Sequence, residues 1–429
     1  MKKFLIILAL MASMPLLAEH VDPETARKVA ATFLGNNGAK ADQLTDLSKA
    51  AGFPNLYIFT TGESFVIVPA DDRITPVLGY STENPFLTEN LPSNLCWWLS
   101  GYDERIVEIR NNNEIAPEEV QKEWKDLISG KNDPKTEDPV QFVTPMISTH
   151  WAQRAPFNNL CPANTVTGCV ATAMAQIMKK WNYPETGIGS HAYIYDAVIH
   201  SVNFGNTIYD WDNMIESYAI EYNSAQATAV ATLMYHCGVS VEMKYVPNDE
   251  SGSTVKRACI ALKTFFNYTG TYLKKSQFND ETSWINRVKQ NLDQGMPLLY
   301  GGYYTDKPGG HAFVCDGYDE SDKLHFNWGW GPGSEGYYTV NSHDYSRNQD
   351  AVFGLRPVTC NAEKPSFLTC SAKTGHIVTL TWDPGSNAEA YNVYRNNMLT
   401  TDCHYYQCFE YSRCYRQVQP QYPRRKRRQ

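Results

Sequence analysis

Near its middle the chain reads Thr167-Gly168-Cys169-Val170-Ala171-Thr172-Ala173-Met174-Ala175. The small residues at alternate positions favour a helix that packs tightly against a neighbour, and Thr167 is suited to be its N-cap. Cys169 would then lie in the first turn, where free backbone N–H groups and the helix dipole lower a thiol pKa. The stretch therefore predicts either a reactive thiolate at a helix start or one more buried cysteine in an alanine-rich helix.

A second unusual stretch is Gly309-Gly310-His311-Ala312-Phe313-Val314-Cys315-Asp316-Gly317-Tyr318. Its glycines allow a substrate backbone to come close, and the apolar run after them is typical of a strand. A thiolate nucleophile needs an imidazole that pairs with it and later protonates the leaving amine. Among the ten histidines of the chain, His311 is the best candidate for this base. A hydrogen-bonded core histidine is the alternative.

Two further segments carry amide side chains beside tryptophan. In His325-Phe326-Asn327-Trp328-Gly329-Trp330-Gly331, the Asn327 oxygen could accept from the far ring nitrogen of His311, and the Trp328 indole could shield that bond from water. The same pair could also be only a strand end and its core plug. In Trp151-Ala152-Gln153, the Gln153 amide could complete an oxyanion hole with the backbone N–H of Cys169.

Composition restricts the class of protein. The chain has 429 residues, of which 42% are hydrophobic and 20% charged, so wholesale disorder and a simple coiled coil are excluded. At about 150 residues per domain, this length suggests roughly three domains. The net charge of −8 gives no sign of a nucleic-acid partner, which normally requires a basic face. The eleven cysteines are scattered without a Cys-x-x-Cys pair, and we expect no metal and no cofactor.

The N-terminus predicts export. Met1-Lys2-Lys3 is a short positive region, and the apolar run after it ends at Ala18. That run is shorter than the ~20 residues needed to cross a bilayer, so we interpret residues 1–18 as a cleaved secretory signal peptide. No later stretch is long and apolar enough for a membrane helix. The expected product is secreted and has no integral membrane segment.

The remaining chain divides into three parts by pattern. Residues 22–33 and 96–129 have helical spacing, and strands are expected at 56–59, 64–68 and 76–80, which together make a small α+β unit. A polar, proline-containing linker follows at 131–136. From about 140 to 356, helices near 169–181, 224–237 and 254–266 precede strands at 298–304, 311–318, 323–328 and 336–340. Helices followed by a sheet favour an α+β fold with two lobes.

The last part resembles the start of a fibronectin or immunoglobulin-like sandwich. Alternation is clear at 377–382 and 390–395, but such a sandwich needs about 100 residues, and only about 65 remain after Lys364. Beyond Thr401 the alternation stops, and the chain ends in the basic run 424–428, which we interpret as a solvated tail. We expect an incomplete β-sandwich-like segment whose composition change is typical of a shifted reading frame.

Together these motifs resemble the streptopain family of secreted bacterial cysteine peptidases. The resemblance rests on the segments around Gln153, Cys169, His311 and Asn327 in that order, and it extends from about 20 to 356. It includes the two stretches 62–73 and 76–81, which are similar to the inhibitory propeptide of the family.

The resemblance implies a papain-like two-lobed cysteine peptidase, with a helical lobe and a β-sheet lobe. Its parts would be a signal peptide at 1–18, an inhibitory propeptide at 19–136, the peptidase domain at 137–358 and the partial sandwich with its basic tail at 359–429. Family members are zymogens that cut off their own propeptide, and the matching boundary here lies at 135–137. Cys169 would be the nucleophile, His311 the base, Gln153 the oxyanion donor, and Asn327 with Trp328 the orienting pair.

The expected function is therefore that of a secreted cysteine endopeptidase. Its partners would be protein or peptide substrates and its own propeptide as an intramolecular inhibitor. A catalytically idle adhesion protein that uses its C-terminal sandwich is the alternative from another class. Within enzymes, a cell-wall amidase with a Cys–His pair is a weaker alternative, because a latent form suits an indiscriminate protease.

Overall fold

The computed structural model describes residues 20–41, 43–89, 91–131, 141–303, 309–340 and 348–358, together with the backbone of six strands between 366 and 421. The expected signal peptide, the boundary between propeptide and peptidase, and the basic run at 424–428 lie outside the described residues. Within the described part, no helix combines the length and the apolar character that a membrane crossing requires.

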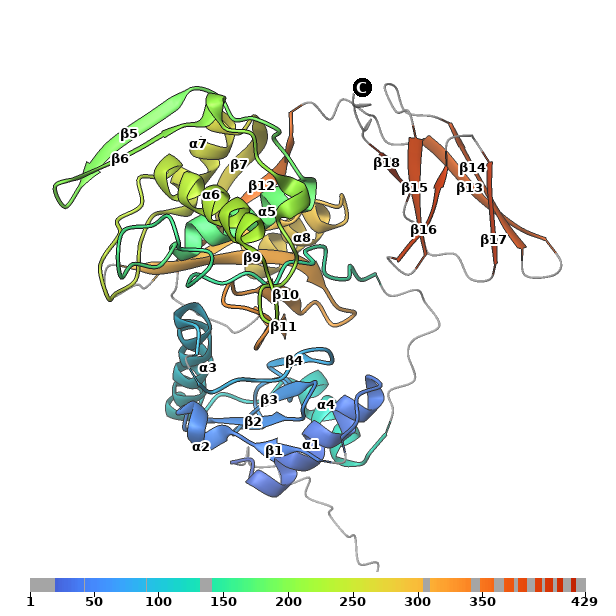
Figure 1. Ribbon diagram of the computed structural model, residues 1–429. Helices are drawn as coiled ribbons and strands as arrows, with labels where there is room; N and C mark the ends of the chain where they lie inside the picture. The colour runs from blue at the N-terminus through green and yellow to red at the C-terminus, as the bar shows by residue number, and fades with distance from the viewer. Residues whose placement is uncertain are drawn as a thin grey trace, which may run out of the picture.

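The N-terminal unit packs helices on both faces of a small antiparallel sheet (Figure 1). Its helices are α1 (Pro23–Asn36), α2 (Ser48–Ala51), α3 (Ser93–Asn111) and α4 (Glu118–Ile128). Its strands are β1 (Thr45–Asp46), β2 (Leu56–Thr60), β3 (Phe65–Pro69) and β4 (Gly79–Ser81). The α+β prediction for this unit is confirmed. The strand expected at 76–80 is wrong in its bounds, because pairing with β3 and β11 begins only at Gly79.

The second unit contains a helical lobe and a sheet lobe (Figure 1). Its helices are α5 (Cys169–Trp181), α6 (Ser224–Ser240), α7 (Val255–Phe265) and α8 (Glu281–Leu292), with short 3₁₀ turns at Phe204–Asn206, Trp211–Asn213 and Lys275–Gln277. The strands are β5 (Ser190–Tyr195), β6 (Val198–Asn203), β7 (Tyr268–Lys274), β8 (Leu298–Tyr303), β9 (Gly310–Tyr318), β10 (Leu324–Asn327), β11 (Gly336–Tyr338) and β12 (Asn348–Pro357). The two-lobed α+β prediction is confirmed, although the sequence analysis did not identify the β5–β6 hairpin, β7, α8 or β12.

One sheet runs through both units. Its strand order is β1-β2-β3-β4-β11-β10-β9-β8-β12-β7, with every pair antiparallel. The junction is β4 against β11, where Tyr80 pairs with Tyr337 and their rings stack. A segment that the sequence presents as a separate domain is therefore joined to the peptidase by backbone pairing.

The apolar cores follow the alternation of strand β9. Ala312 and Val314 belong to a core around α5, α6 and α7, whereas Phe313 and Cys315 belong to a core that α3 and α8 cover. Because neighbouring residues of a strand point to opposite faces, β9 separates the helical lobe from the face on which α3 lies. The buried residues of a third core, around α1 and α4, belong to the N-terminal unit, and Tyr337 of β11 packs against them.

The C-terminal part contains two three-stranded sheets, of which the structure describes the backbone. They are formed by β13 (Ser366–Lys373), β14 (Ile377–Asp383) and β17 (Gln407–Tyr411), and by β15 (Ala390–Arg395), β16 (Met398–Cys403) and β18 (Val418–Gln421). The strands expected at 377–382 and 390–395 match β14 and β15. Strands β17 and β18 lie beyond Thr401, where the sequence pattern predicted none.

Candidate active site

Cys169 is the first residue of α5, as the sequence predicts, but the residue that caps the helix is different. The N-cap is Gly168, and no side chain caps the helix there, so the assignment of Thr167 was wrong. Gly168 has φ +87°, and a Cβ at this position would lie 2.6 Å from the sulfur of Met243 and 2.9 Å from the carbonyl oxygen of Ser251. Only glycine fits both constraints. The Thr167 hydroxyl instead pairs with the Thr172 hydroxyl at 2.8 Å.

The thiol of Cys169 is held in its neutral form. Burial raises its pKa to about 11, and this effect exceeds the opposing one of the Ala312 backbone N–H, which donates to Sγ at 3.4 Å. The helix start supplies N–H groups, as expected, yet removal of water from the thiolate costs more. The thiolate that the sequence predicts is therefore not favoured in this arrangement of the chain.

His311 lies near the start of β9, directly before Ala312, whose backbone N–H contacts the Cys169 thiol. It pairs with Gly302 of β8, and residues paired across strands share a face. By alternation that is the face of Phe313, toward α3, whereas Ala312 faces α5 and Cys169. His311 is 6% exposed, and its Nδ1 lies 3.9 Å from Glu250 Oε2. The backbone thus brings His311 next to Cys169, and the imidazole lies beside the Glu250 carboxylate.

Gln153 is buried beside the cysteine loop and is ready to donate a hydrogen bond. Its carbonyl accepts from Thr167 N at 3.1 Å, which ties the 151–153 segment to the residues before Cys169. Its side chain is 2% exposed, and within the described structure Nε2 has no hydrogen-bond partner. A buried amide donor without a partner costs free energy, and such groups are found where a ligand or a reacting atom supplies the acceptor.

Asn327 ends β10 and is fully engaged by its neighbours. Its Oδ1 accepts from Gln176 Nε2 at 2.8 Å and from Gly329 N at 3.1 Å, and its Nδ2 donates to the Thr149 carbonyl at 2.8 Å. These contacts fix the amide beside α5. The bond to His311 that the sequence suggests stays a prediction.

Trp328 packs in the core that α3 covers. It is 1% exposed, its Nε1 donates to the Ser334 carbonyl at 3.0 Å, and its ring lies 4.7 Å from that of Phe313. Its own carbonyl accepts from Asn94 Nδ2 of the N-terminal unit at 2.7 Å. The residue is therefore both a core plug and a point of attachment for α3.

Sequence reasoning missed the residues through which α3 holds the site. Trp97 lies against Gly302, the strand partner of His311, so closely that a Cβ at 302 would overlap the indole. Trp98 meets Phe326 edge-on at 4.9 Å. The signal in the sequence was the pair of adjacent tryptophans in one helix. Together they present more apolar surface than the small N-terminal core requires.

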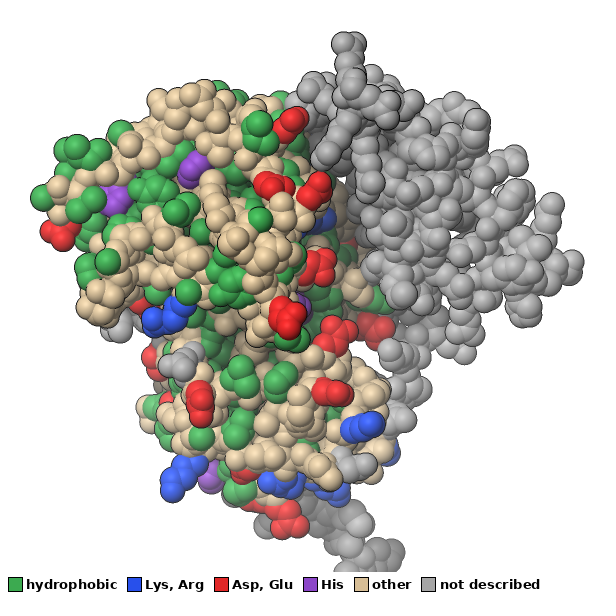
Figure 2. Space-filling view, viewed as in Figure 1, with side chains coloured by type: hydrophobic (Ala, Val, Ile, Leu, Met, Phe, Trp, Pro, Cys, Tyr) green, Lys and Arg blue, Asp and Glu red, His purple; other side chains and the backbone are tan. Residues whose placement is uncertain are grey.

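A groove of about 1010 Å³ runs along the junction of the two units in front of these residues. One side comes from the N-terminal unit and the other from the loops around Cys169; its lining includes Leu87, Leu91, Ala152, Val166, Glu250 and Trp330. Figure 2 shows acidic side chains gathered along this junction, and Glu89, Asp249 and Glu250 contribute to the groove. A polypeptide lying here would pass both Gln153 and the cysteine loop. In the described residues no cluster of three or more His, Cys, Asp or Glu side chains could hold a metal ion.

Comparisons with known proteins agree with this geometry. Residues 151–338 match the model of the Peptidase C10 family, and residues 18–106 match that of the Spi protease inhibitor. Streptopain of Streptococcus pyogenes is 31% identical over 331 residues, which are 71% of this chain and 81% of streptopain. The thiol protease/hemagglutinin PrtT of Porphyromonas gingivalis is 32% identical over 334 residues, but the chain spans only 37% of that protein.

Among solved structures, a fragment of prointerpain A from Prevotella intermedia is similar in fold. It is 34% identical, has a TM-score of 0.60, and is covered over 98% of its length by 73% of this chain. The fold, the cysteine at a helix start and the attached inhibitor unit define a cysteine peptidase with an N-terminal inhibitory propeptide. The chain belongs to the streptopain family, the C10 family of peptidases. It is a cysteine endopeptidase made as a zymogen, and these relatives do not favour the idle adhesion protein.

Proposed function

We propose that Cys169 is the nucleophile of this endopeptidase and that His311 is its base. The thiolate attacks the scissile carbonyl, the imidazolium gives its proton to the leaving amine, and water then hydrolyses the acyl-enzyme with His311 as base. Gln153 Nε2 and the Cys169 N–H bind the oxyanion, and Asn327 with Trp328 orients the imidazole. The observation that carries this assignment is the buried, unpartnered Gln153 amide beside the cysteine loop.

Catalysis requires the imidazole to leave the face on which it lies in the precursor. Trp97 packs beside the His311 strand pair, and the thiol is neutral there. Removal of α3 opens the space beside Gly302, so that the imidazole can turn toward Sγ and form the thiolate–imidazolium pair. We assign residues 19–136 to the inhibitory propeptide and residues 137–358 to the peptidase. The signal at 1–18 directs the product out of the cell.

The acidic side chains along the junction give no support for a nucleic-acid partner. Substrates are polypeptides that enter the groove lined by Ala152 and Val166 after the Leu87–Leu91 segment has left. The C-terminal strands at 366–421 are outside this groove and take no part in the chemistry.

The assignment is tested with thiol variants of the full precursor. Cys169→Ala should give a folded, unprocessed precursor without peptidase activity that does not react with a thiol-directed epoxide. Cys161→Ala removes another partly buried thiol and serves as the matched control, which should mature and cleave casein. Self-maturation by Cys169→Ala would remove this residue from the nucleophile role.

Loss of the oxyanion donor is tested separately. Gln153→Ala should lower turnover by ~10²–10³, with little change in KM, because one donor to the oxyanion is lost. Gln153→Glu keeps the shape of the side chain but has no donor when it is ionised. Its turnover should fall by as much as that of Gln153→Ala. An unaltered turnover in both variants would remove Gln153 from the site.

A further inference from the structure

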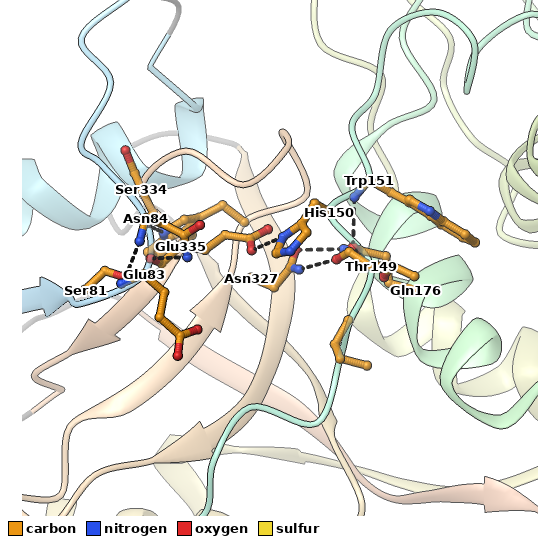
Figure 3. A network of polar contacts seen from close by, with 12 residues as sticks. Ser81, Glu83, Asn84, Thr149, His150, Trp151, Gln176, Asn327, Ser334 and Glu335 are labelled. Atoms are coloured by element: carbon orange, nitrogen blue, oxygen red, sulfur yellow. Dashed lines mark hydrogen bonds and ion pairs between the residues drawn. The ribbon is translucent and has the colours of Figure 1, made fainter. Parts of the chain in front are cut away.

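Gln176 is an unexpected polar residue in the apolar helix that begins with Cys169. It lies about two turns after the cysteine on the same side of α5, and it is 0% exposed among alanine, methionine and isoleucine. A buried amide without hydrogen-bond partners would lose its bonds to water without replacement, which destabilises the fold. Both polar atoms of the side chain are hydrogen-bonded instead, in the network of Figure 3.

The partners of Gln176 belong to two other segments of the site. Its Oε1 accepts from the Thr149 hydroxyl at 2.9 Å and from the Trp151 N–H at 3.3 Å. Its Nε2 donates to Asn327 Oδ1 at 2.8 Å. Asn327 Nδ2 in turn donates to the Thr149 carbonyl at 2.8 Å, so the three segments are bonded in a closed ring. They carry the thiol, the Gln153 amide and the Asn327–Trp328 pair.

Backbone groups fix the orientation of both amides. The Trp151 N–H and Gly329 N–H can only donate, and the Thr149 carbonyl can only accept. Asn327 must therefore point Nδ2 at Thr149 and Oδ1 at Gly329, which leaves Oδ1 facing Gln176. Gln176 must point Oε1 at Trp151 and Nε2 at Asn327. Reversal of either amide would set donor against donor and acceptor against acceptor.

We propose that Gln176 is a positioning residue for the peptidase reaction, which holds Gln153 and Asn327 at fixed distances from the Cys169 thiol. The proposal rests on the function proposed above. Asn327 is a direct partner of the Gln176 amide, and the Trp151 N–H that donates to it lies two residues before Gln153. Misplacement of a reacting group by about 1 Å can lower the rate by ~10². Loss of the Gln176 hydrogen bonds should therefore lower turnover.

The decisive variant is Gln176→Glu, which has the same shape. When ionised it still accepts from Thr149 and Trp151 but cannot donate to Asn327, so two acceptors face each other. When protonated it donates again, because a carboxylic acid carries one O–H. We expect kcat to fall up to about 100-fold at neutral pH with little change in KM, and the ratio of variant to wild-type kcat to rise as pH falls.

The pH profile must be compared with the wild type, because other titratable groups lie on the same elements. These groups are His150 with its partner Glu335, His325 with its partner Asp316, and Cys169 and Lys180 on α5. They are the same in both enzymes, so the difference between the two profiles belongs to residue 176. Rates are expressed per active site titrated with the epoxide, which removes unfolded protein from the comparison.

Two controls separate positioning from stability. Asn291→Asp in α8 is the matched control, because it also removes one amide donor from a buried side chain. The Asn291 Nδ2 donates to the Met296 carbonyl, and its Oδ1 accepts from Gly354 N, both at 2.7 Å. This variant should lose stability but keep kcat per titrated site. Thr149→Val removes one bond to Gln176 and should lower kcat by a smaller factor, which Thr149→Ser should largely recover.

The experiment uses full precursors that are matured with a trace of tagged wild-type enzyme, which is then removed. Wild-type kcat and an unchanged pH profile in Gln176→Glu would overturn the proposal, as would an equal loss of kcat in Asn291→Asp. If Gln176→Glu does not fold, Thr149→Val with wild-type kcat overturns it in the same way. If the epoxide does not label Cys169 in the wild-type enzyme, the proposed function itself is contradicted.

Discussion

At the residue scale, Cys169, the proposed nucleophile, shows two opposing effects on one thiol. The start of α5 offers N–H groups that favour a thiolate, and the sequence pattern identifies that position correctly. Burial opposes the charge and wins, so the pKa of Cys169 rises to about 11 in the precursor. The raised pKa therefore favours the neutral thiol at this position.

The first prediction concerns the reactivity of this thiol. In the precursor, alkylation of Cys169 should be slow at pH 7 and rise about tenfold per pH unit up to a pKa of about 11, because only the thiolate reacts. In the mature enzyme an imidazolium stabilises the thiolate, and the rate should be high and nearly flat across neutral pH. Short pulses of iodoacetamide followed by intact mass resolve the two forms.

Equal alkylation rates for precursor and mature enzyme at pH 7 would contradict this prediction. Cys161, whose pKa burial raises to about 12, gives an internal reference for an inert thiol in the same molecule.

At the element scale, α3 belongs to the N-terminal unit by sequence but to the peptidase by packing. Leu95, Trp97, Trp98 and Tyr102 share a core with Tyr300, Phe313 and Phe326. The Tyr102 hydroxyl also donates to the Thr339 carbonyl at 2.5 Å. This helix therefore contributes an aromatic face that covers the strand of His311, whereas the buried residues around α1 and α4 belong to their own unit.

The second prediction tests this division of labour between helices. Residues 20–131 added in trans should inhibit the mature enzyme, because the third core gives the unit apolar packing of its own. Trp97→Ala should weaken the inhibition by about 100-fold or more, as expected for a buried aromatic anchor at an interface.

Trp124→Ala is the matched control for this helix experiment. Trp124 is also buried, but its indole N–H donates within the unit to the Ile74 carbonyl at 2.8 Å. Once its folded fraction is taken into account, this variant should inhibit as well as the unchanged unit. Equal weakening by both substitutions would place the Trp97 effect in the stability of the unit instead of in the interface.

At the scale of the whole molecule, inhibitor and enzyme form one sheet through β4 and β11 (Figure 1). Tyr80 adds a bond across this junction, since its hydroxyl donates to Asp319 Oδ2 at 2.9 Å. The six C-terminal strands pair only among themselves in the described backbone. The peptidase sheet ends at β7, which pairs with β12.

The third prediction follows from that separation. Truncation after Val358 should leave maturation and turnover unchanged, because β12 and β7 complete the peptidase sheet before that point. The measurements are kcat and KM on a peptide and the melting temperature of the precursor. Truncation after Phe353, which removes residues of β12 that pair with β7, is the destabilising control. A loss of folding on cutting after Val358 would show that the C-terminal part packs on the peptidase.

Local sequence determined those features of this protein that depend on near neighbours. The helix that starts at Cys169 and the alternation of β9 are readable because helix starts and strand faces are set within a few residues. The motifs around Gln153, Cys169, His311 and Asn327 were readable for the same reason. The N-cap was assigned wrongly because crowding by Met243 and Ser251, which lie far along the chain, is what requires glycine.

Only the tertiary structure decided what these residues face. Nothing near Tyr80 in sequence reveals that its strand pairs with Tyr337, and nothing near Trp97 reveals Gly302 as its neighbour. The raised pKa of Cys169 likewise depends on water excluded by distant segments. Sheet edges, burial and amide networks such as that of Gln176 are formed by long-range packing, and their energies depend on partners that a local pattern does not contain.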